Sequence, residues 1–187
     1  MRPAAVEKMG YYPTHEQVVR AIASYIQPAA EEAKARLLDP CAGEGAAAAL
    51  LGSLLGCVTW GCELSYARAA LAEKVLDRLY QAGWENVSLS EESISLLFLN
   101  PPYDNDRESK KRFEVTFLKS AAPKLIRGGL LVYIVPQRIL SVLEVARVLA
   151  GHFENYTVGR YRDSAYGQVV VLATRRAKYH VPNGEEL

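Results

Sequence analysis

The 187-residue sequence has few cysteines, little net charge and no long apolar run. Its three cysteines, Cys41, Cys57 and Cys62, are odd in number and lack the paired spacing of a zinc site, which argues against a disulfide framework or a bound metal. We therefore expect reduced, buried thiols and no metal. No apolar stretch reaches the roughly 18 residues of a membrane span, and the N-terminus lacks the apolar core of a signal peptide. The sequence predicts a cytoplasmic protein.

Charge is scarce overall but uneven along the chain. The net charge is only +1, yet residues 1–99 carry 8 Lys/Arg and 12 Asp/Glu, net −4, whereas residues 100–187 carry 14 and 9, net +5. A positive second half suits a polyanionic substrate such as nucleic acid. Charges of this size also commonly form an ordinary solvated surface, and that alternative stays open.

Helical and strand patterns alternate over the whole length. We predict helices over residues 14–27, 45–55, 65–81, 109–125 and 141–149, and strands over 36–39, 57–63, 86–90, 94–99, 130–135, 156–161 and 169–174. Thr14 and Gln17 have the spacing of a capping box at the start of the first helix. The pattern indicates an α/β fold with a mostly parallel sheet and helices on both faces. The last two strands have no helix between them and must pair antiparallel.

A glycine-containing loop follows the first predicted strand, with the sequence Asp39-Pro40-Cys41-Ala42-Gly43-Glu44-Gly45. Its glycines allow a tight turn and a close ligand, although they could also merely turn the chain. Together with Glu63 at the end of the next strand, the loop matches the dinucleotide fingerprint, so the spacing alone does not separate NAD from S-adenosylmethionine (SAM). The carboxylates of Asp39 and Glu44 disfavour a pyrophosphate and favour the cationic SAM. Glu63 is placed to accept hydrogen bonds from ribose hydroxyls, unless it is a solvated strand end.

A second polar tip, Asn100-Pro101-Pro102-Tyr103, follows the apolar strand at 94–99. The Asn100 side-chain carbonyl and the Pro101 backbone carbonyl could accept both N–H bonds of a planar amino group, orient its lone pair and stabilise the positive charge that grows on nitrogen. The two prolines stiffen the loop. Tyr103 offers a face on which an extruded base can stack. This chemistry requires no strong general base.

These two motifs are where the chain resembles class I SAM-dependent methyltransferases, and among them the adenine-N6 DNA methyltransferases. The resemblance implies a single Rossmann-like domain over residues 1–187 with a seven-stranded, mostly parallel sheet and an antiparallel final strand, in which residues 1–30 close over the cofactor. It also implies methyl transfer from SAM to the exocyclic amino nitrogen of adenine in DNA. The implied SAM-binding residues are Tyr12, Thr14, Asp39, Ala42, Gly43, Gly45, Glu63 and Asn100.

By the same resemblance, the catalytic residues are Asn100, Pro101, Pro102 and Tyr103, and Tyr103 and Tyr166 hold the target base. An ordinary hairpin aromatic is the alternative for Tyr166. Lys110 and Lys111, in a basic run after the tetrad, are expected to bind phosphates, although a charged loop is often only a solvated face.

Two departures from the family pattern matter. The usual Asp after the third predicted strand, which contacts the cofactor adenine, is missing, and Ser90 or Glu91 would have to substitute for it. The chain also leaves no room after its last strand for a target-recognition domain, so we expect a recognition partner, a further C-terminal region or low site preference. The alternatives are an RNA adenine or guanine methyltransferase, a protein glutamine methyltransferase, and a catalytically weak subunit that needs a partner.

Overall fold

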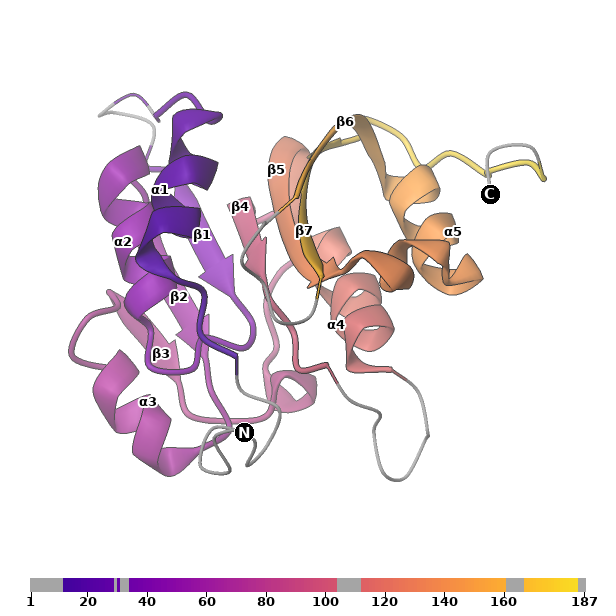
Figure 1. Ribbon diagram of the computed structural model, residues 1–187. Coiled ribbons are helices and arrows are strands. Elements are labelled where there is room, and N and C mark those ends of the chain that lie inside the picture. Colours follow the sequence, from indigo (N-terminus) through magenta and orange to yellow (C-terminus); the bar gives the residue numbers. More distant parts are fainter. Residues whose placement is uncertain (1–11, 29, 31–33, 104–111, 161–166, 185–187) are drawn as a thin grey trace. The chain divides into compact units, whose positions relative to one another are not determined.

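The computed structural model describes residues 12–28, 30, 34–103, 112–160 and 167–184 (Figure 1). The chain divides into two compact units, Met1–Ser88 and Leu89–Leu187. The assignment of the chain to a single domain stays a prediction.

The described residues of unit 1 form three parallel strands and three α-helices. In chain order these are α1 (Glu16–Ser24), β1 (Arg36–Asp39), α2 (Ala46–Leu55), β2 (Val58–Cys62), α3 (Tyr66–Ala72), β3 (Arg78–Tyr80) and the 3₁₀ turn η2 (Trp84–Asn86). Strand β2 lies between β1 and β3 and pairs parallel with both. The strand predicted at 36–39 is confirmed at both ends. Its apolar residues are buried, and the polar Asp39 ends the run.

Helix α1 is amphipathic and packs against α2 through buried Val18, Val19 and Ile22. The predicted capping box is wrong. The helix begins two residues later than predicted, and its N-cap is His15, whose side chain makes no capping hydrogen bond. The backbone carbonyl of His15 accepts the N–H groups of Val18 and Val19 and so begins the helix. Helix α2 approaches β2 closely, since a Cβ on Gly52 would lie 2.2 Å from a methyl group of Thr59.

The helix predicted over 65–81 is only half right. Helix α3 ends at Ala72, and the chain then enters the sheet as β3. The Asp77 carboxylate accepts hydrogen bonds from the Thr59 N–H (2.7 Å) and from the Thr59 hydroxyl (2.8 Å). These two hydrogen bonds fix the turn that leads into the strand. The guanidinium of Arg78 also lies 4.7 Å from the Trp60 ring centroid. These tertiary contacts override a locally helical sequence. The strand predicted at 86–90 is also wrong, since the observed third strand lies earlier in the chain.

In unit 2, the part of the chain that the structure describes forms four strands and two α-helices. They are β4 (Ile94–Leu99), α4 (Phe113–Ala121), η3 (Ala122–Lys124), β5 (Leu125–Pro136), η4 (Gln137–Ser141), α5 (Leu143–His152), β6 (Phe153–Arg160) and β7 (Gln168–Arg175). Strand β4 pairs parallel with β5, whereas β7 lies antiparallel between β5 and β6. The strand at 94–99 and the antiparallel final pair are therefore confirmed. Strand β5 begins five residues earlier than predicted, because Leu125 pairs with Ile94 before a shift in register.

The strands of the chain make a seven-stranded mixed sheet, mostly parallel and flanked by helices, which confirms the predicted fold class. The core of unit 2 centres on side chains with almost no exposed surface, among them Leu97, Phe98 and Tyr133. Among the described residues, no helix is long and apolar enough to cross a membrane. Three polar residues lie at the carboxyl ends of their strands. Asp39 is the last residue of β1, Glu63 directly follows β2, and Asn100 directly follows β4.

Candidate active site

Asp39 ends β1 as a buried carboxylate. Its Oδ1 accepts the backbone N–H of Cys41 at 3.0 Å, which bends the chain into the loop. Burial, opposed by the hydrogen bonds from Cys41 and assisted by the nearby Glu63, raises the pKa of Asp39 to about 7. Asp39 can therefore change charge near neutral pH, and an arriving cation would favour its ionised form.

The glycine loop has the tight geometry that its composition predicts. Gly43 and Gly45 both have positive φ, of 58° and 82°. A Cβ on Gly45 would lie 2.9 Å from a methyl group of Val75 and 3.0 Å from the backbone of Ala72, so the position requires glycine for both conformation and space. The N–H of Ala42 donates to the Cys62 carbonyl at 2.8 Å, which ties the loop to the end of β2.

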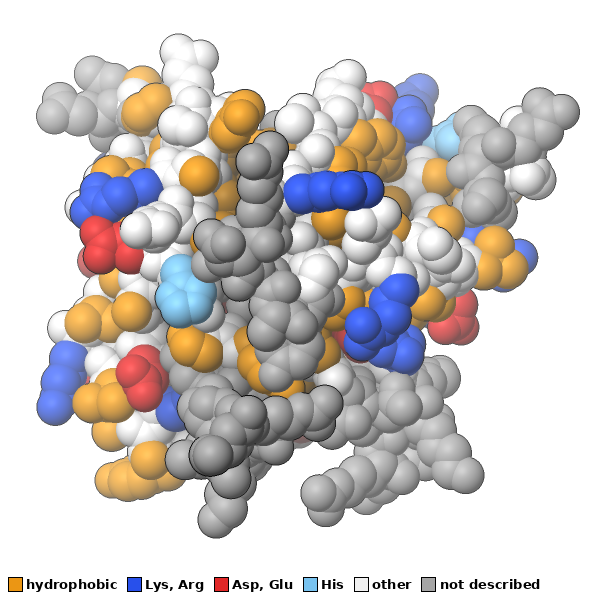
Figure 2. All heavy atoms as spheres, viewed as in Figure 1, with side chains coloured by type: hydrophobic (Ala, Val, Ile, Leu, Met, Phe, Trp, Pro, Cys, Tyr) orange, Lys and Arg blue, Asp and Glu red, His pale blue; other side chains and the backbone are white. Residues whose placement is uncertain are grey.

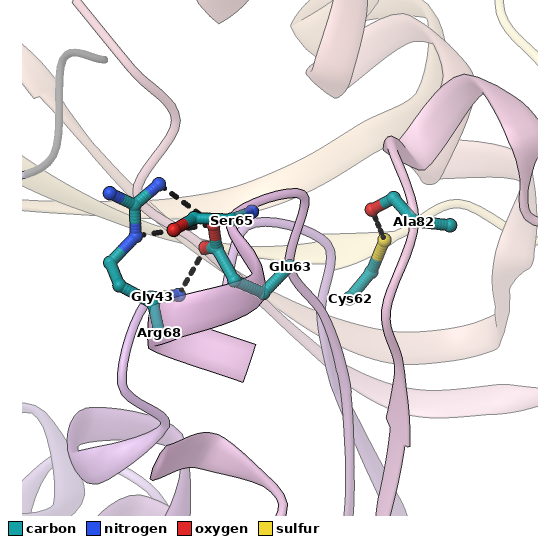
Figure 3. A network of polar contacts seen from close by, with 6 residues as sticks. All are labelled: Gly43, Cys62, Glu63, Ser65, Arg68 and Ala82. Carbon is teal, nitrogen blue, oxygen red and sulfur yellow. Dashed lines mark hydrogen bonds and ion pairs between the residues drawn. The ribbon is translucent and has the colours of Figure 1, made fainter. Parts of the chain in front are cut away.

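Glu63 is the centre of a buried polar network (Figure 3). Its Oε2 accepts the Gly43 N–H at 2.9 Å, and its Oε1 accepts the Ser65 N–H at 2.7 Å. The Arg68 guanidinium also donates to Oε1, at 2.7 and 3.1 Å. The alternative of a solvated strand end is therefore wrong. Glu63 shapes the glycine loop, and its charge is balanced by an arginine that sequence reasoning had missed.

Cys62, beside Glu63, is a buried thiol whose Sγ lies 3.0 Å from the Ala82 carbonyl oxygen and donates to it (Figure 3). Burial, and then the carboxylates around it, raise the pKa of Cys62 to about 12, so the thiol stays protonated. Cys41 and Cys57 are only half-buried, which corrects the prediction of three buried thiols.

The segment after the third strand also differs from the prediction. Because β3 ends at Tyr80, the residues that follow it are Gln81 and Ala82, and not Ser88 to Glu91. Ser90 and Glu91 instead lie in the turn that leads to β4. Gln81 is thus the exposed polar side chain at the carboxyl end of β3. Only the tertiary placement of β3 reveals it.

In unit 2, the tetrad directly follows β4. Asn100, Pro102 and Tyr103 are half-buried and Pro101 is buried. The Tyr103 hydroxyl donates to Oδ1 of Asn100 at 2.7 Å, and Nε2 of Gln168 donates to the Tyr103 hydroxyl. The side chain of Asn100 therefore has a defined orientation. Sequence reasoning had missed Gln168, which is 65 residues from Tyr103 in the chain.

The remaining predicted site residues lie either outside the described part of the chain or just before α1. Tyr166, Lys110 and Lys111 lie outside the described residues. Tyr12 and Thr14 are half-buried and precede α1. Of the basic run after the tetrad, Arg112 is described, and its guanidinium pairs at 3.3 Å with the fully buried Glu114 of α4.

The positive charge of unit 2 gathers partly away from the tetrad. A cavity of about 380 Å³ is lined by four cationic side chains and one carboxylate, together with His152, Ala177 and Tyr179; the charged residues are Arg127, Arg175, Arg176, Lys178 and Glu92. Glu92 precedes β4, whereas Asn100 follows it, so this cavity lies toward the opposite end of that strand. On the face shown in Figure 2, the described Lys and Arg side chains are scattered. The net charge of the second half of the chain therefore does not by itself indicate that phosphates bind near the tetrad.

Comparisons with known proteins agree with this geometry. Residues 3–186 match the Uncharacterised methyltransferase family (DUF6094). A type I restriction-modification methyltransferase subunit from Streptococcus thermophilus superposes with a TM-score of 0.74 at 16% identity, over 90% of this chain and 45% of that one. A SAM-dependent O-methyltransferase from Thermotoga maritima superposes with a TM-score of 0.65 at 18% identity, over 91% of this chain and 69% of that one. A tRNA (m1A58) methyltransferase from Aquifex aeolicus superposes with a TM-score of 0.63 at 16% identity, over 90% of this chain and 72% of that one.

No curated protein gives a significant match. At these identities the solved structures establish the fold alone, and that fold agrees with the prediction of SAM as the cofactor. The family match covers nearly the whole chain. The chain therefore belongs to this methyltransferase family and has the fold of SAM-dependent methyltransferases.

Proposed function

We propose that this protein transfers a methyl group from SAM to the exocyclic amino nitrogen of adenine in DNA. The observation that carries the proposal is the Asn100–Tyr103 tetrad at the carboxyl end of β4, with the Asn100 amide held by the Tyr103 hydroxyl at 2.7 Å. An aryl amine is a poor nucleophile because its lone pair is conjugated with the ring. Two fixed carbonyl acceptors, from Asn100 and Pro101, favour the geometry in which the lone pair is free to attack.

The residues of unit 1 fit SAM as the methyl donor. SAM supplies a methyl group that is activated by a positively charged sulfur. Asp39, whose ionised form a cation would favour, and Glu63 provide negative charge beside the glycine loop. Oε1 of Glu63 already accepts three N–H groups and Oε2 only that of Gly43, so a ribose hydroxyl can donate to Oε2 beside Gly43, or to Oε1 by displacing the Arg68 guanidinium. Gln81 is our candidate for the contact with the cofactor adenine.

DNA is the preferred substrate on two grounds. The aromatic-Pro-Thr sequence at residues 12–14 resembles the cofactor-closing segment of adenine-N6 DNA methyltransferases. Among the superposed structures described above, the type I restriction-modification methyltransferase subunit has the highest TM-score. RNA bases and protein glutamine present the same planar nitrogen to the tetrad, so they are the competing substrates that an experiment must include.

The test is mass spectrometry after incubation with SAM that carries an isotope-labelled methyl group. Purified protein is given single- and double-stranded DNA, RNA and a protein mixture in parallel, with the Asn100→Ala variant as the catalytic control. We expect label on the adenine N6 of DNA with the wild-type chain and on the order of 100-fold less, or none, with the variant. Label on RNA or glutamine alone would replace DNA as the substrate, and label on none of them would reject the proposed activity.

A further inference from the structure

The tetrad is linked to the last strand of the sheet through Gln168. This residue begins β7, where it pairs with Pro136 at the end of β5. The backbone of the preceding residue, Gly167, has a φ of 58° and accepts the N–H of Gln137 at 3.0 Å. The start of β7 is thus anchored by backbone hydrogen bonds on both sides of Gln168, and it provides a rigid base for the side chain.

The direction of the hydrogen bonds fixes the orientation of the Asn100 amide. The Gln168 amide nitrogen can only donate, so the Tyr103 hydroxyl oxygen accepts from it. The single hydroxyl proton of Tyr103 is then directed to Oδ1 of Asn100 at 2.7 Å. As a result the carbonyl of Asn100 faces Tyr103 and its NH₂ group points the other way.

We propose that Gln168 is a positioning residue for methyl transfer, acting through Tyr103 to hold the Asn100 carbonyl in the orientation that receives the target amino group. The proposal rests on the function proposed above for the tetrad. A carbonyl oxygen can accept two hydrogen bonds, so an amino group can share Oδ1 with the Tyr103 hydroxyl. The arrangement costs no reorganisation when the substrate arrives, which is the condition under which such contacts contribute most to the rate.

The kinetic test compares Gln168→Met, which keeps the length of the side chain and removes its amide, with the wild-type protein on its confirmed substrate. Loss of one positioning hydrogen bond should lower kcat about 3- to 10-fold while the KM for SAM stays unchanged. Gln168→Glu should lower kcat further at pH 8, because a carboxylate accepts the Tyr103 proton and draws it from Asn100. Its activity should recover toward that of Gln168→Met as the pH falls. Gln137→Met, at an exposed neighbouring site, is the matched control and should change nothing.

A double-mutant cycle separates positioning from a general structural effect. In a Tyr103→Phe background, Gln168→Met should cause no further loss of kcat, because the link to Asn100 is already broken. Losses that simply add would overturn the proposal.

A second measurement needs no substrate. With ¹³C-labelled tyrosine, the Cζ signal of Tyr103 is identified by its absence in Tyr103→Phe, and it should shift in Gln168→Met but not in Gln137→Met. An unchanged signal would overturn the proposal even if kcat falls. If the wild-type chain methylates no substrate, the proposed function fails and the positioning role fails with it, whereas a shifted signal would still establish the hydrogen bond.

Discussion

The acidic positions of unit 1 and the tetrad of unit 2 are built in different ways. Glu63 is buried and bonded to the backbone N–H groups of Gly43 and Ser65, so it holds the loop in shape. Asn100 is half-buried, and its Oδ1 accepts a hydrogen bond from the side chain of Tyr103. A change at Glu63 must therefore alter the fold and ligand binding together. A change at Asn100 can alter chemistry with little effect on folding. The predictions that follow test this contrast.

The largest effect is expected for Asn100→Ala. It removes a preorganised acceptor, so methyl transfer should fall by on the order of 100-fold or more. Calorimetric titration with SAM and thermal unfolding should show nearly unchanged affinity and Tm. Asn86→Ala, at an exposed position of η2, is the control. Normal turnover in Asn100→Ala would reduce the tetrad to a structural turn.

Glu63→Ala should affect binding and stability at once. It removes the acceptor of the Gly43 and Ser65 N–H groups and of the Arg68 guanidinium, so SAM affinity should weaken by roughly 1–3 kcal/mol and Tm should fall. Titration and thermal unfolding of the same samples check both, with the exposed Glu73→Ala as the control. A loss of affinity with an unchanged Tm would break the contrast between the two regions.

Gly45→Ala tests the loop without changing its charge. An alanine at a φ of 82°, with its Cβ 2.9 Å from a Val75 methyl group, should destabilise unit 1 by about 1–2 kcal/mol. Urea unfolding measures this. Gly159→Ala serves as the control, because a Cβ there meets nothing within 4 Å. Equal stability of the two variants would contradict the close approach of the loop to Ala72 and Val75.

The smallest effect concerns pH. The pKa of Asp39 is about 7, and a bound cation favours the ionised carboxylate, so SAM binding should release a proton and strengthen as the pH rises. The ionised fraction of such a group grows about tenfold between pH 6 and pH 8, and the affinity should follow it. Titration at several pH values checks the slope, which Asp39→Asn should flatten. An equal slope in that variant would assign the proton to another group.

The sequence by itself determined the elements whose pattern is local. The strands at 36–39 and 94–99 are short apolar runs that a polar residue ends or follows, and the observed strands have the predicted bounds. The glycine loop was predictable because only glycine adopts positive φ without strain. The antiparallel final pair followed from the absence of a helix between its strands.

Tertiary contacts decided the rest. Residues 78–80 join the sheet because Asp77 bonds to Thr59, 18 residues away, and no local pattern reports that contact. The same placement of β3 puts Gln81, our candidate for the contact with the cofactor adenine, at the carboxyl end of the third strand. Gln168 reaches Tyr103 across 65 residues of chain, since antiparallel pairing brings the start of β7 beside the end of β5. Which side chains are chemically suited to the reaction can be read from the sequence, but which partners orient them depends on strand pairing, because hydrogen bonds require contact in space.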